Sequence, residues 1–294
     1  MIGHSFERTR LAVGVARPAA VFLALALAAP AAAQEARETG GWASTEFSRV
    51  RLVAAVEAVG PGEAIRAGFH VRLSEGWHFY WRSAGETGFP PVFDWSGSAN
   101  VRSVDVAWPA PDRLNLLGFD TYGYSHEVLL PLGITAIKAG EPMVLWLRAN
   151  YAICSDEVCT YHDETFVVRF PAGAAAPSVH AGLIERFAKR VPTGDTSDLR
   201  IVGVSAVGEG EERTIVVRAT SAAGFLAPDL IVEGPASIYF GIPKTDLADG
   251  GHTARLGLPV TDYGEGVSLA GVRLTLTLID GLRAVEQTMA VGQR

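Results

Sequence analysis

The sequence predicts an all-β protein made of two β-sandwiches joined by a short linker with one helix. Short runs in which apolar and polar side chains alternate recur along the chain, as in strands with one buried face. The 32 glycines and 16 prolines among the 294 residues supply turn signals between these runs. Only residues 178–190 show the spacing of apolar residues that a helix needs.

The first sandwich is expected over residues 45–171. Gly60-Pro61-Gly62 supplies its first turn, and Pro109 and Pro111 end its fourth strand. Residues 83–91 form a loop rich in glycine and proline after the aromatic third strand. The predicted strands are Val50–Val56, Ile65–Leu73, Gly76–Arg82, Val101–Trp108, Val128–Ile134 and Met143–Ala149, followed by a hairpin over Tyr151–Phe166.

A linker is predicted over residues 172–198, where the alternation of apolar and polar residues typical of strands stops. Ser178 is the expected N-cap of a helix over Ser178–Arg190. Leu183, Ile184, Phe187 and Ala188 form its one apolar face, so we expect this face to be buried.

The second sandwich is expected over residues 199–292, with a hairpin turn at Asp280-Gly281. Seven short strands in one such stretch are typical of an immunoglobulin-like sandwich. The segment has no cysteine and no acid–base cluster, so a spacer or docking role is expected. The predicted strands are Arg200–Val207, Arg213–Thr220, Leu230–Glu233, Ile238–Phe240, Ala254–Pro259, Arg273–Ile279 and Ala284–Val291.

Residues 1–33 have the features of a cleavable signal peptide. Arg8, Arg10 and Arg17 precede an apolar run over residues 19–29, and Ala31-Ala32-Ala33 offers a cleavage site. The run is short for a membrane span, which needs about 20 apolar residues. We therefore expect an exported chain, located in a bacterial periplasm, with no transmembrane segment after cleavage.

The charge of the chain argues against nucleic acid or anionic lipid as a partner. The net charge is −7 for the whole sequence. Removal of residues 1–33, which hold three arginines and one glutamate, makes it about −9. Because the sequence shows no basic cluster, we expect no nucleic-acid binding.

Cys154 and Cys159 are the only cysteines. Export places them where disulfides persist. A disulfide closing a loop this small adds roughly 2 kcal/mol, which a domain of this size does not need for folding. This favours a functional pair, although a structural disulfide stays open as an alternative.

The pattern around the cysteines predicts a hairpin with the turn Ser155–Val158. In that register Cys154 faces Cys159 at a distance that permits a disulfide. Tyr151 and His162 then lie on the other face, so His162 is a poor base for Cys159. The acidic Asp156 and Glu157 disfavour thiolates, which predicts a reducing rather than an oxidising couple.

Metal binding is the competing use of this segment. Cys154, Cys159 and His162 have the spacing C-x4-C-x2-H, and soft sulfur ligands suit Cu(I) or Zn(II). A closed zinc site needs a fourth ligand, and His70, His78 or His126 joins only if folding brings it there. The G-x-S-x-G motif of hydrolases and the C-x-x-C motif of thioredoxins are both missing from the sequence. We expect no cofactor.

Five segments in matching order carry a resemblance to a known family. They are G-W-H-F-Y-W-R at 76–82, the loop through Pro91, W-P-A-P at 108–111, Y-G-Y-S-H-E-V-L-L at 122–130 and Y-A-I-C-S-D-E-V-C at 151–159. Together they resemble the amino-terminal periplasmic domain of the DsbD/ScsB thiol-disulfide reductases. The second sandwich resembles the additional β-domain of the ScsB-type branch.

The resemblance implies that Cys154 and Cys159 are a redox-active pair that passes electrons to periplasmic disulfides through mixed disulfides. It also implies that Cys159 is the sulfur that engages partners. An aromatic cap loop is expected at 114–124, with Phe119, Asp120 and Tyr122 as candidates for shielding the pair. Ordinary loop or core positions are the alternative for these residues.

The chain ends at Arg294, and the sequence shows neither the membrane segments nor the thioredoxin-like domain of a complete reductase. We therefore expect a free-standing relative, or one whose membrane partner is encoded separately. The expected electron donor is a membrane thiol-disulfide reductase or a thioredoxin-like protein. The expected acceptors are periplasmic proteins with disulfides, including those that handle copper stress.

Overall fold

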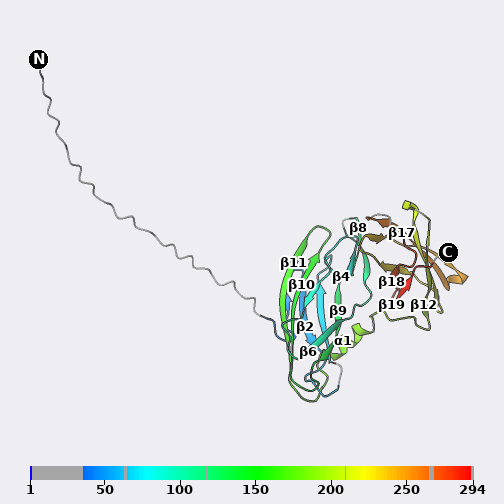
Figure 1. The fold of residues 1–294 in the computed structure, drawn as a ribbon. Coiled ribbons are helices and arrows are strands. Elements are labelled where there is room, and N and C mark those ends of the chain that lie inside the picture. The colour runs from blue at the N-terminus through cyan, green and yellow to red at the C-terminus, as the bar shows by residue number, and fades with distance from the viewer. Residues whose placement is uncertain (2–35, 63–64, 117, 209, 265–267, 293–294) are drawn as a thin grey trace. The chain divides into compact units, whose positions relative to one another are not determined.

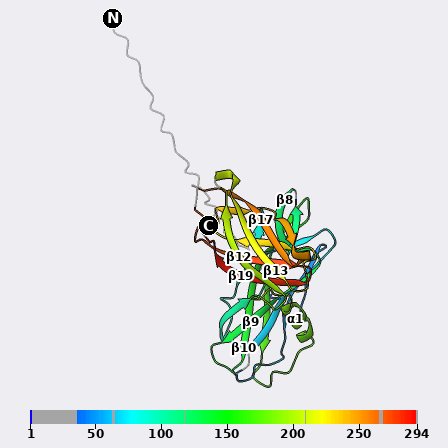
Figure 2. The ribbon, with the colours of Figure 1, turned by 90° about the vertical axis from the view of Figure 1, so that its right-hand side faces the viewer.

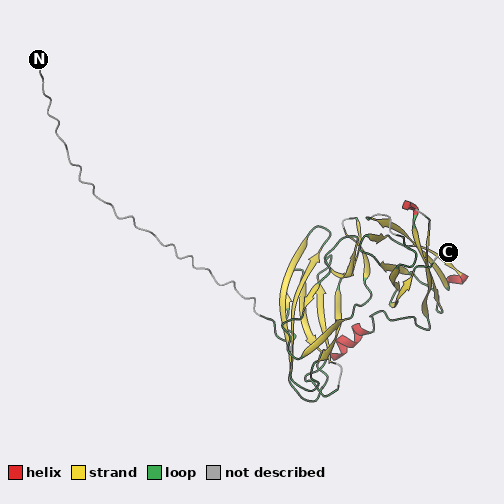
Figure 3. Cartoon of the chain, viewed as in Figure 1, coloured by secondary structure: helices red, strands yellow, loops and turns green. Residues whose placement is uncertain are grey.

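Four antiparallel sheets make up the described part of the chain in the computed structural model (Figures 1 and 3). The structure describes residues 1, 36–62, 65–116, 118–208, 210–264 and 268–292. The expected all-β architecture of two immunoglobulin-like sandwiches with one linker helix is confirmed. The predicted signal peptide lies outside the described residues, apart from Met1, and stays a prediction.

One sheet of the first sandwich has the strand order β1-β2-β3-β9-β6, and the other has β11-β10-β4-β8-β7 with β5 paired to β10. The strands are β1 Ala43–Ser44, β2 Ser48–Ala54, β3 Ile65–Leu73, β4 His78–Gly85, β5 Val92–Asp94, β6 Val101–Val106, β7 Asp112–Leu116, β8 Phe119–Tyr124, β9 Glu127–Ala136, β10 Met143–Cys154 and β11 Cys159–Phe170.

Apolar side chains from the two facing sheets form the core of the first sandwich. Phe69 on β3 is completely buried and contacts the rings of Phe79, Tyr151 and Phe166, with ring centres about 6 Å apart. Along β3 the buried Phe69 and Val71 alternate with His70 and Arg72, as a period of two predicts.

The linker helix α1, Ala181–Ala188, is shorter than predicted. His180, not Ser178, is its N-cap, and no side chain caps it. The Ser178 hydroxyl instead donates to the carbonyl of Ala54 at the end of β2, 2.5 Å away. The expected apolar face is confirmed for Ile184 and Phe187, which are buried in the core of the first sandwich. Each contributes about 1.5–3 kcal/mol to holding the linker on that sandwich.

The second sandwich has the sheets β12-β13-β17-β15, with β16 paired to β17, and β14-β18-β19 (Figure 2). A separate apolar core lies between them. The strands are β12 Leu199–Val207, β13 Thr214–Ser221, β14 Asp229–Glu233, β15 Ile238–Phe240, β16 Lys244–Ala248, β17 Thr253–Asp262, β18 Arg273–Asp280 and β19 Arg283–Ala290, with one-turn 3-10 helices at Gly210–Glu212 and Asp249–Gly251.

Residues 34–294 form one compact unit, so the two sandwiches contact each other directly. Ile231 of β14 is completely buried and packs with the core of the first sandwich. Arg82 of β4 pairs with Glu233 and Glu286 of the second sandwich at 2.6 and 2.5 Å. No helix in the described part of the chain is long and apolar enough to cross a membrane.

Candidate functional site

The hairpin of β10 and β11 brings the two cysteines together. Cys154 pairs with Cys159 in the predicted register, and Tyr151 pairs with His162. The two sulfurs form a disulfide, with the Cα atoms 4.0 Å apart. The backbone N–H of Ser155 donates to the carbonyl of Val158 across the turn, at 2.8 Å. The alternation of the sequence and the four-residue turn are therefore sufficient to oppose the sulfurs.

The two cysteines differ in their exposure to solvent. Cys154 is 1 % exposed, whereas Cys159 is partly exposed at the start of β11. Cys154 lies in a small apolar cluster with Tyr80, Ala84, Leu116 and Ala152, separate from the two sandwich cores. A partner can therefore reach Cys159 more easily than Cys154.

Two segments pack on the face of the sheet that carries the cysteines. One is the loop after β4, which packs closely on Tyr80. A Cβ atom added to Gly88 of this loop would lie 2.5 Å from the Tyr80 ring. In the same loop Phe89 makes an edge-to-face contact with Tyr161, with ring centres 5.1 Å apart. The other segment is the β7–β8 hairpin, which contributes Leu114 and Leu116.

The predicted shielding residues lie on different sides of the β7–β8 hairpin. Phe119 is 45 % exposed near the tip and is not part of the buried cluster around Cys154. Asp120 and Tyr122 are buried and hydrogen-bonded to each other, and Asp120 also accepts a hydrogen bond from Tyr239 of the second sandwich. The buried hairpin residue in the cluster that holds Cys154 is Leu116, which is aliphatic and was not among the predicted shielding residues.

His162 lies on the face opposite the sulfurs, as its register predicted. Its Nε2 is 2.9 Å from the hydroxyl of Thr160, and its ring stacks on Tyr151 at 5.0 Å. Burial lowers its pKa. Within the described ranges no group of three His, Cys, Asp or Glu side chains is placed to hold a metal ion.

His78, which the sequence offered only as one of three histidines that folding could bring to the cysteines, lies near the sulfurs. It lies on β4 directly opposite Cys154 of β10, so both side chains are on one face of the sheet. Its Nε2 is 3.9 Å from Asp156, and its buried Nδ1 has no hydrogen-bond partner among the described residues. Burial lowers the pKa of His78, although nearby Asp156 opposes this shift. Only the pairing of β4 with β10, which sequence alone does not give, identifies it.

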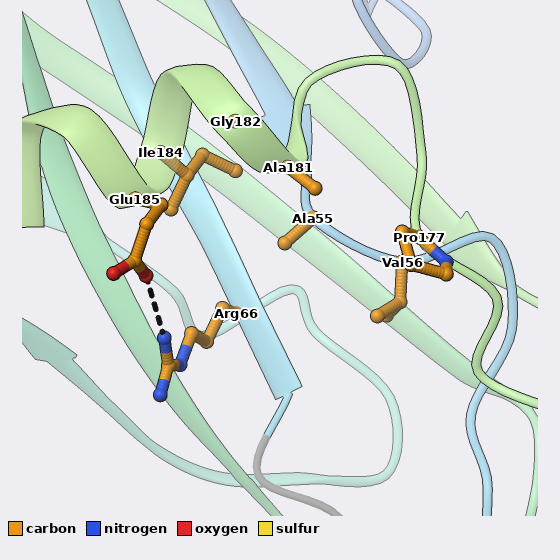
Figure 4. A pocket seen from close by; sticks show the side chains of 8 residues that line it. All are labelled: Ala55, Val56, Arg66, Pro177, Ala181, Gly182, Ile184 and Glu185. Atoms are coloured by element: carbon orange, nitrogen blue, oxygen red, sulfur yellow. Dashed lines mark hydrogen bonds and ion pairs between the residues drawn. The ribbon is translucent and has the colours of Figure 1, made fainter.

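A pocket of about 580 Å³ lies elsewhere on the first sandwich (Figure 4). It is bounded by Ala55 and Arg66, at the ends of β2 and β3, and by α1, where Glu185 pairs with Arg66 at 3.4 Å. The cysteines lie at the other end of the sandwich, next to the connection between β3 and β4. The chemically distinctive site is therefore the surface around the hairpin and not this pocket.

Comparison with known families gives matches for both halves of the chain. Residues 46–171 match the family described as "Thiol:disulfide interchange protein DsbD, N-terminal". Residues 190–294 match a domain of unknown function, DUF8393. No curated protein matches the sequence.

Among solved structures, the amino-terminal periplasmic domain of ScsB from Proteus mirabilis matches with a TM-score of 0.68 and 22% identity, covering 86% of this chain and 98% of that one. The YadV chaperone matches with a TM-score of 0.20 and 10% identity, over 82% of this chain and 99% of that one. The second score is too low to indicate a shared fold. The resemblance expected from the sequence motifs is therefore confirmed, and it supports a thiol-disulfide exchange module.

Proposed function

We propose, from the match of residues 46–171 to the amino-terminal domain of DsbD, that this protein relays reducing equivalents to disulfides of exported proteins. Cys154 and Cys159 cycle between a disulfide and a dithiol. The observation that carries the proposal is the opposed pair at the end of a hairpin, with one buried and one accessible cysteine. A buried second sulfur is protected from side reactions and is already next to the sulfur that it must attack.

The exchange has two steps. In the reduced protein the thiolate of Cys159 attacks one sulfur of the partner's disulfide, and the partner's other sulfur leaves as a thiolate that takes up a proton. The thiolate of Cys154 then attacks Sγ of Cys159 in this mixed disulfide. The Cys154–Cys159 bond forms, the second partner thiol is released, and two electrons have passed to the partner.

A dithiol donor restores the reduced pair by the reverse sequence. Its thiolate attacks Sγ of Cys159, and Cys154 leaves and takes up a proton. The donor's second thiolate then attacks the donor sulfur of the mixed disulfide, so the donor's own disulfide forms and Cys159 leaves as the thiol. A membrane thiol-disulfide reductase or a thioredoxin-like protein in the periplasm supplies this dithiol. Proteins that handle copper stress are among the acceptors that we propose.

The local charges favour a reducing couple. Asp156 and Glu157 lie in the turn between the cysteines, and negative charge disfavours a thiolate. Oxidising dithiols depend on stabilisation of the reduced thiolate form, which this turn does not provide. The apolar cluster in which Cys154 is buried with Leu116 and Tyr80 limits unproductive oxidation of the reduced pair.

Exposed apolar side chains next to Cys159 offer a docking surface for a partner. Val158, Tyr161 and Phe89 are 54 %, 66 % and 49 % exposed. Tyr161 shares the cysteine face and contacts Phe89. Large apolar side chains left in solvent beside a reactive group are typical of interaction sites. We propose that they bind the polypeptide around the partner's disulfide.

The redox equilibrium of the purified protein tests the proposal. The protein is equilibrated with a dithiothreitol or glutathione series, and its free thiols are alkylated and counted by mass. A reversible midpoint near that of thioredoxin, about −270 mV, or somewhat above it, is expected. A midpoint far below about −300 mV, the range of structural disulfides, would contradict electron relay. Cys154→Ala, which keeps Cys159, should trap acceptors as mixed disulfides.

A further inference from the structure

The β7–β8 hairpin has two faces with different contacts. Leu114 and Leu116 point to the same side as the cysteines and pack in the cluster around Cys154. Arg113, between Asp112 and Leu114, points to the other side together with its cross-strand neighbour Tyr122. The hairpin therefore joins the apolar cluster that holds Cys154 with one face, and its opposite face is free to contact another part of the chain.

Arg113 connects this opposite face to the second sandwich. Its Nε and Nη2 donate to the two carboxylate oxygens of Asp229 at 2.9 and 3.0 Å, and Nη2 also donates to the carbonyl of Leu230 at 2.9 Å. The side chain of Arg113 is 15% exposed and that of Asp229 is 29% exposed. A bidentate, largely buried pair of this kind fixes both position and orientation.

Asp120 provides a second connection from the same hairpin. Its Oδ2 accepts hydrogen bonds from Arg113, from Tyr122 at 3.2 Å, and from Tyr239 of β15 at 3.1 Å. Tyr239 belongs to the second sandwich. One buried carboxylate is therefore shared by the hairpin and the second sandwich, and its pKa is raised by burial.

The hairpin needs such an anchor because it lies at the margin of its sheet. The strand order ends β4-β8-β7, so β7 pairs with β8 alone. The ladder between β4 and β8 is interrupted between Tyr80 and Gly85. A two-stranded hairpin with so little support opens easily unless other contacts hold it.

We propose that the second sandwich holds the β7–β8 hairpin in the apolar cluster that buries Cys154, and so sets the rate at which thiols reach the disulfide. Arg113 and Asp120 are the positioning residues on the hairpin, and Asp229 and Tyr239 are their partners. The second sandwich is then part of the exchange apparatus and not only a spacer. The consequence for electron transfer rests on the function proposed above, whereas the gating of access does not.

The structure offers a matched control on the same strand. Asp229 and Glu233 are both on β14, and both pair with an arginine of the first sandwich. Asp229 pairs with Arg113 of the hairpin, whereas Glu233 pairs with Arg82 of β4. Asp229→Ala and Glu233→Ala therefore remove equal charge from one interface, but only the first loosens the hairpin.

The test is the rate of reduction of Cys154–Cys159 by dithiothreitol in the whole mature chain, followed by alkylation and mass measurement. Asp229→Ala should accelerate reduction by about tenfold, because the population of the open hairpin rises when its buried ion pair is lost. Glu233→Ala should stay within about twofold of the parent. The redox midpoint should be the same in all three proteins, since a gate changes forward and reverse rates together.

Tyr239→Phe is a second, milder variant for the case that Asp229→Ala does not fold. It removes one hydroxyl and leaves the ring. It should give a smaller acceleration, with amide exchange of Leu114–Leu116 rising in parallel. Equal rates in the parent, Asp229→Ala and Tyr239→Phe proteins would overturn the inference, as would equal acceleration by Glu233→Ala. A midpoint typical of structural disulfides would reject electron relay and leave the measured gating unaffected.

Discussion

His78 and Cys154 face each other across the β4–β10 pairing, while Cys159 faces Cys154 from the other side. Cys154 is buried, and burial in an apolar cluster disfavours its thiolate. In the proposed exchange, the closing step nevertheless needs that thiolate. A neutral imidazole on the same face is positioned to take the proton.

We predict that His78→Gln slows closure of the mixed disulfide by a factor on the order of ten to a hundred near neutral pH. The pKa of His78 is lowered by burial, so the ring is neutral and able to accept a proton there. Asp156 and Asp112 oppose this lowering, and His126 adds to it. The measurement is the pH profile for loss of a preformed mixed disulfide at Cys159.

His162→Gln is the matched control for that prediction. His162 is also partly buried on the cysteine hairpin, but it lies on the opposite face. Its replacement should leave the rate of closure within about twofold of the parent, because only a group within reach of the proton contributes. Equal pH profiles for the His78→Gln and parent proteins would show that solvent takes the proton.

A second prediction concerns the exposed ring pair beside Cys159. Phe89→Ser should weaken docking of a protein partner and raise the apparent KM for exchange by about tenfold, the effect of one good interface contact. Reduction by dithiothreitol, which needs no docking, should change by less than about twofold. Steady-state exchange with a thioredoxin-like donor measures the first rate.

Leu247→Ser is a suitable control for the docking prediction. Leu247 is a comparably exposed apolar residue, 46 % exposed, but it lies on β16 of the second sandwich. It should leave both rates unchanged. If Phe89→Ser also leaves the apparent KM unchanged, the ring pair is not the docking surface.

A third prediction is that the dithiol form stays folded. The disulfide closes a small loop within an already paired hairpin, so reduction should cost roughly 2 kcal/mol of unfolding free energy. The ladder of β10 with β11 extends from Met143 to Cys154 and does not depend on the bond. Urea unfolding of oxidised and reduced protein measures the difference, and a loss of more than about 5 kcal/mol would indicate a structural disulfide.

The register of the cysteine hairpin was predictable from the sequence because it depends on local signals. The alternation of side chains and the four-residue turn oppose Cys154 and Cys159 without help from distant residues. The strand Ile65–Leu73 was predicted with its observed bounds for the same reason. Strands β5 and β16 were missed, since three or five residues on a sheet margin carry little periodicity.

The surroundings of the site depended on contacts between distant segments and were not predictable. The cap was expected as an aromatic loop, but Asp112–Leu116 and Phe119–Tyr124 are paired strands, and an aliphatic side chain, Leu116, joins the cluster that holds Cys154. The sequence predicted Asp120 as a polar neighbour of the cysteines. Its partner Tyr239 is 119 positions away in the chain, so no local pattern pointed to the second sandwich.

An ion-pair cluster around Glu127 was also not predicted from the sequence, in which no group of basic residues stands close together. Arg72 and Arg186 pair with the carboxylate of Glu127 at 2.8 and 3.3 Å. The same carboxylate lies 2.8 Å from Nε2 of the completely buried His70, whose Nδ1 accepts from Arg51 at 3.1 Å. The arginines come from different strands and from α1, so only the fold brings them together.

The last prediction uses this cluster to relate stability to pH. Burial lowers the pKa of His70 from 6.5 to about 4, with Arg51 and Arg72 adding to the shift and Glu127 opposing it. Between these values the unfolded chain binds a proton that the folded protein does not, so stability falls as the pH falls from 6.5 to 4. At full extent the loss from this group is about 3 kcal/mol.

Urea unfolding at pH 7.5, 5.5 and 4.5 tests this relationship in the parent and in His70→Gln. The variant should lose stability at every pH because a buried ring with two hydrogen bonds is replaced, but its pH dependence should be shallower by about 2 kcal/mol over this interval. Parallel curves for the parent and His70→Gln would mean that His70 takes up its proton equally in both states, contrary to its burial.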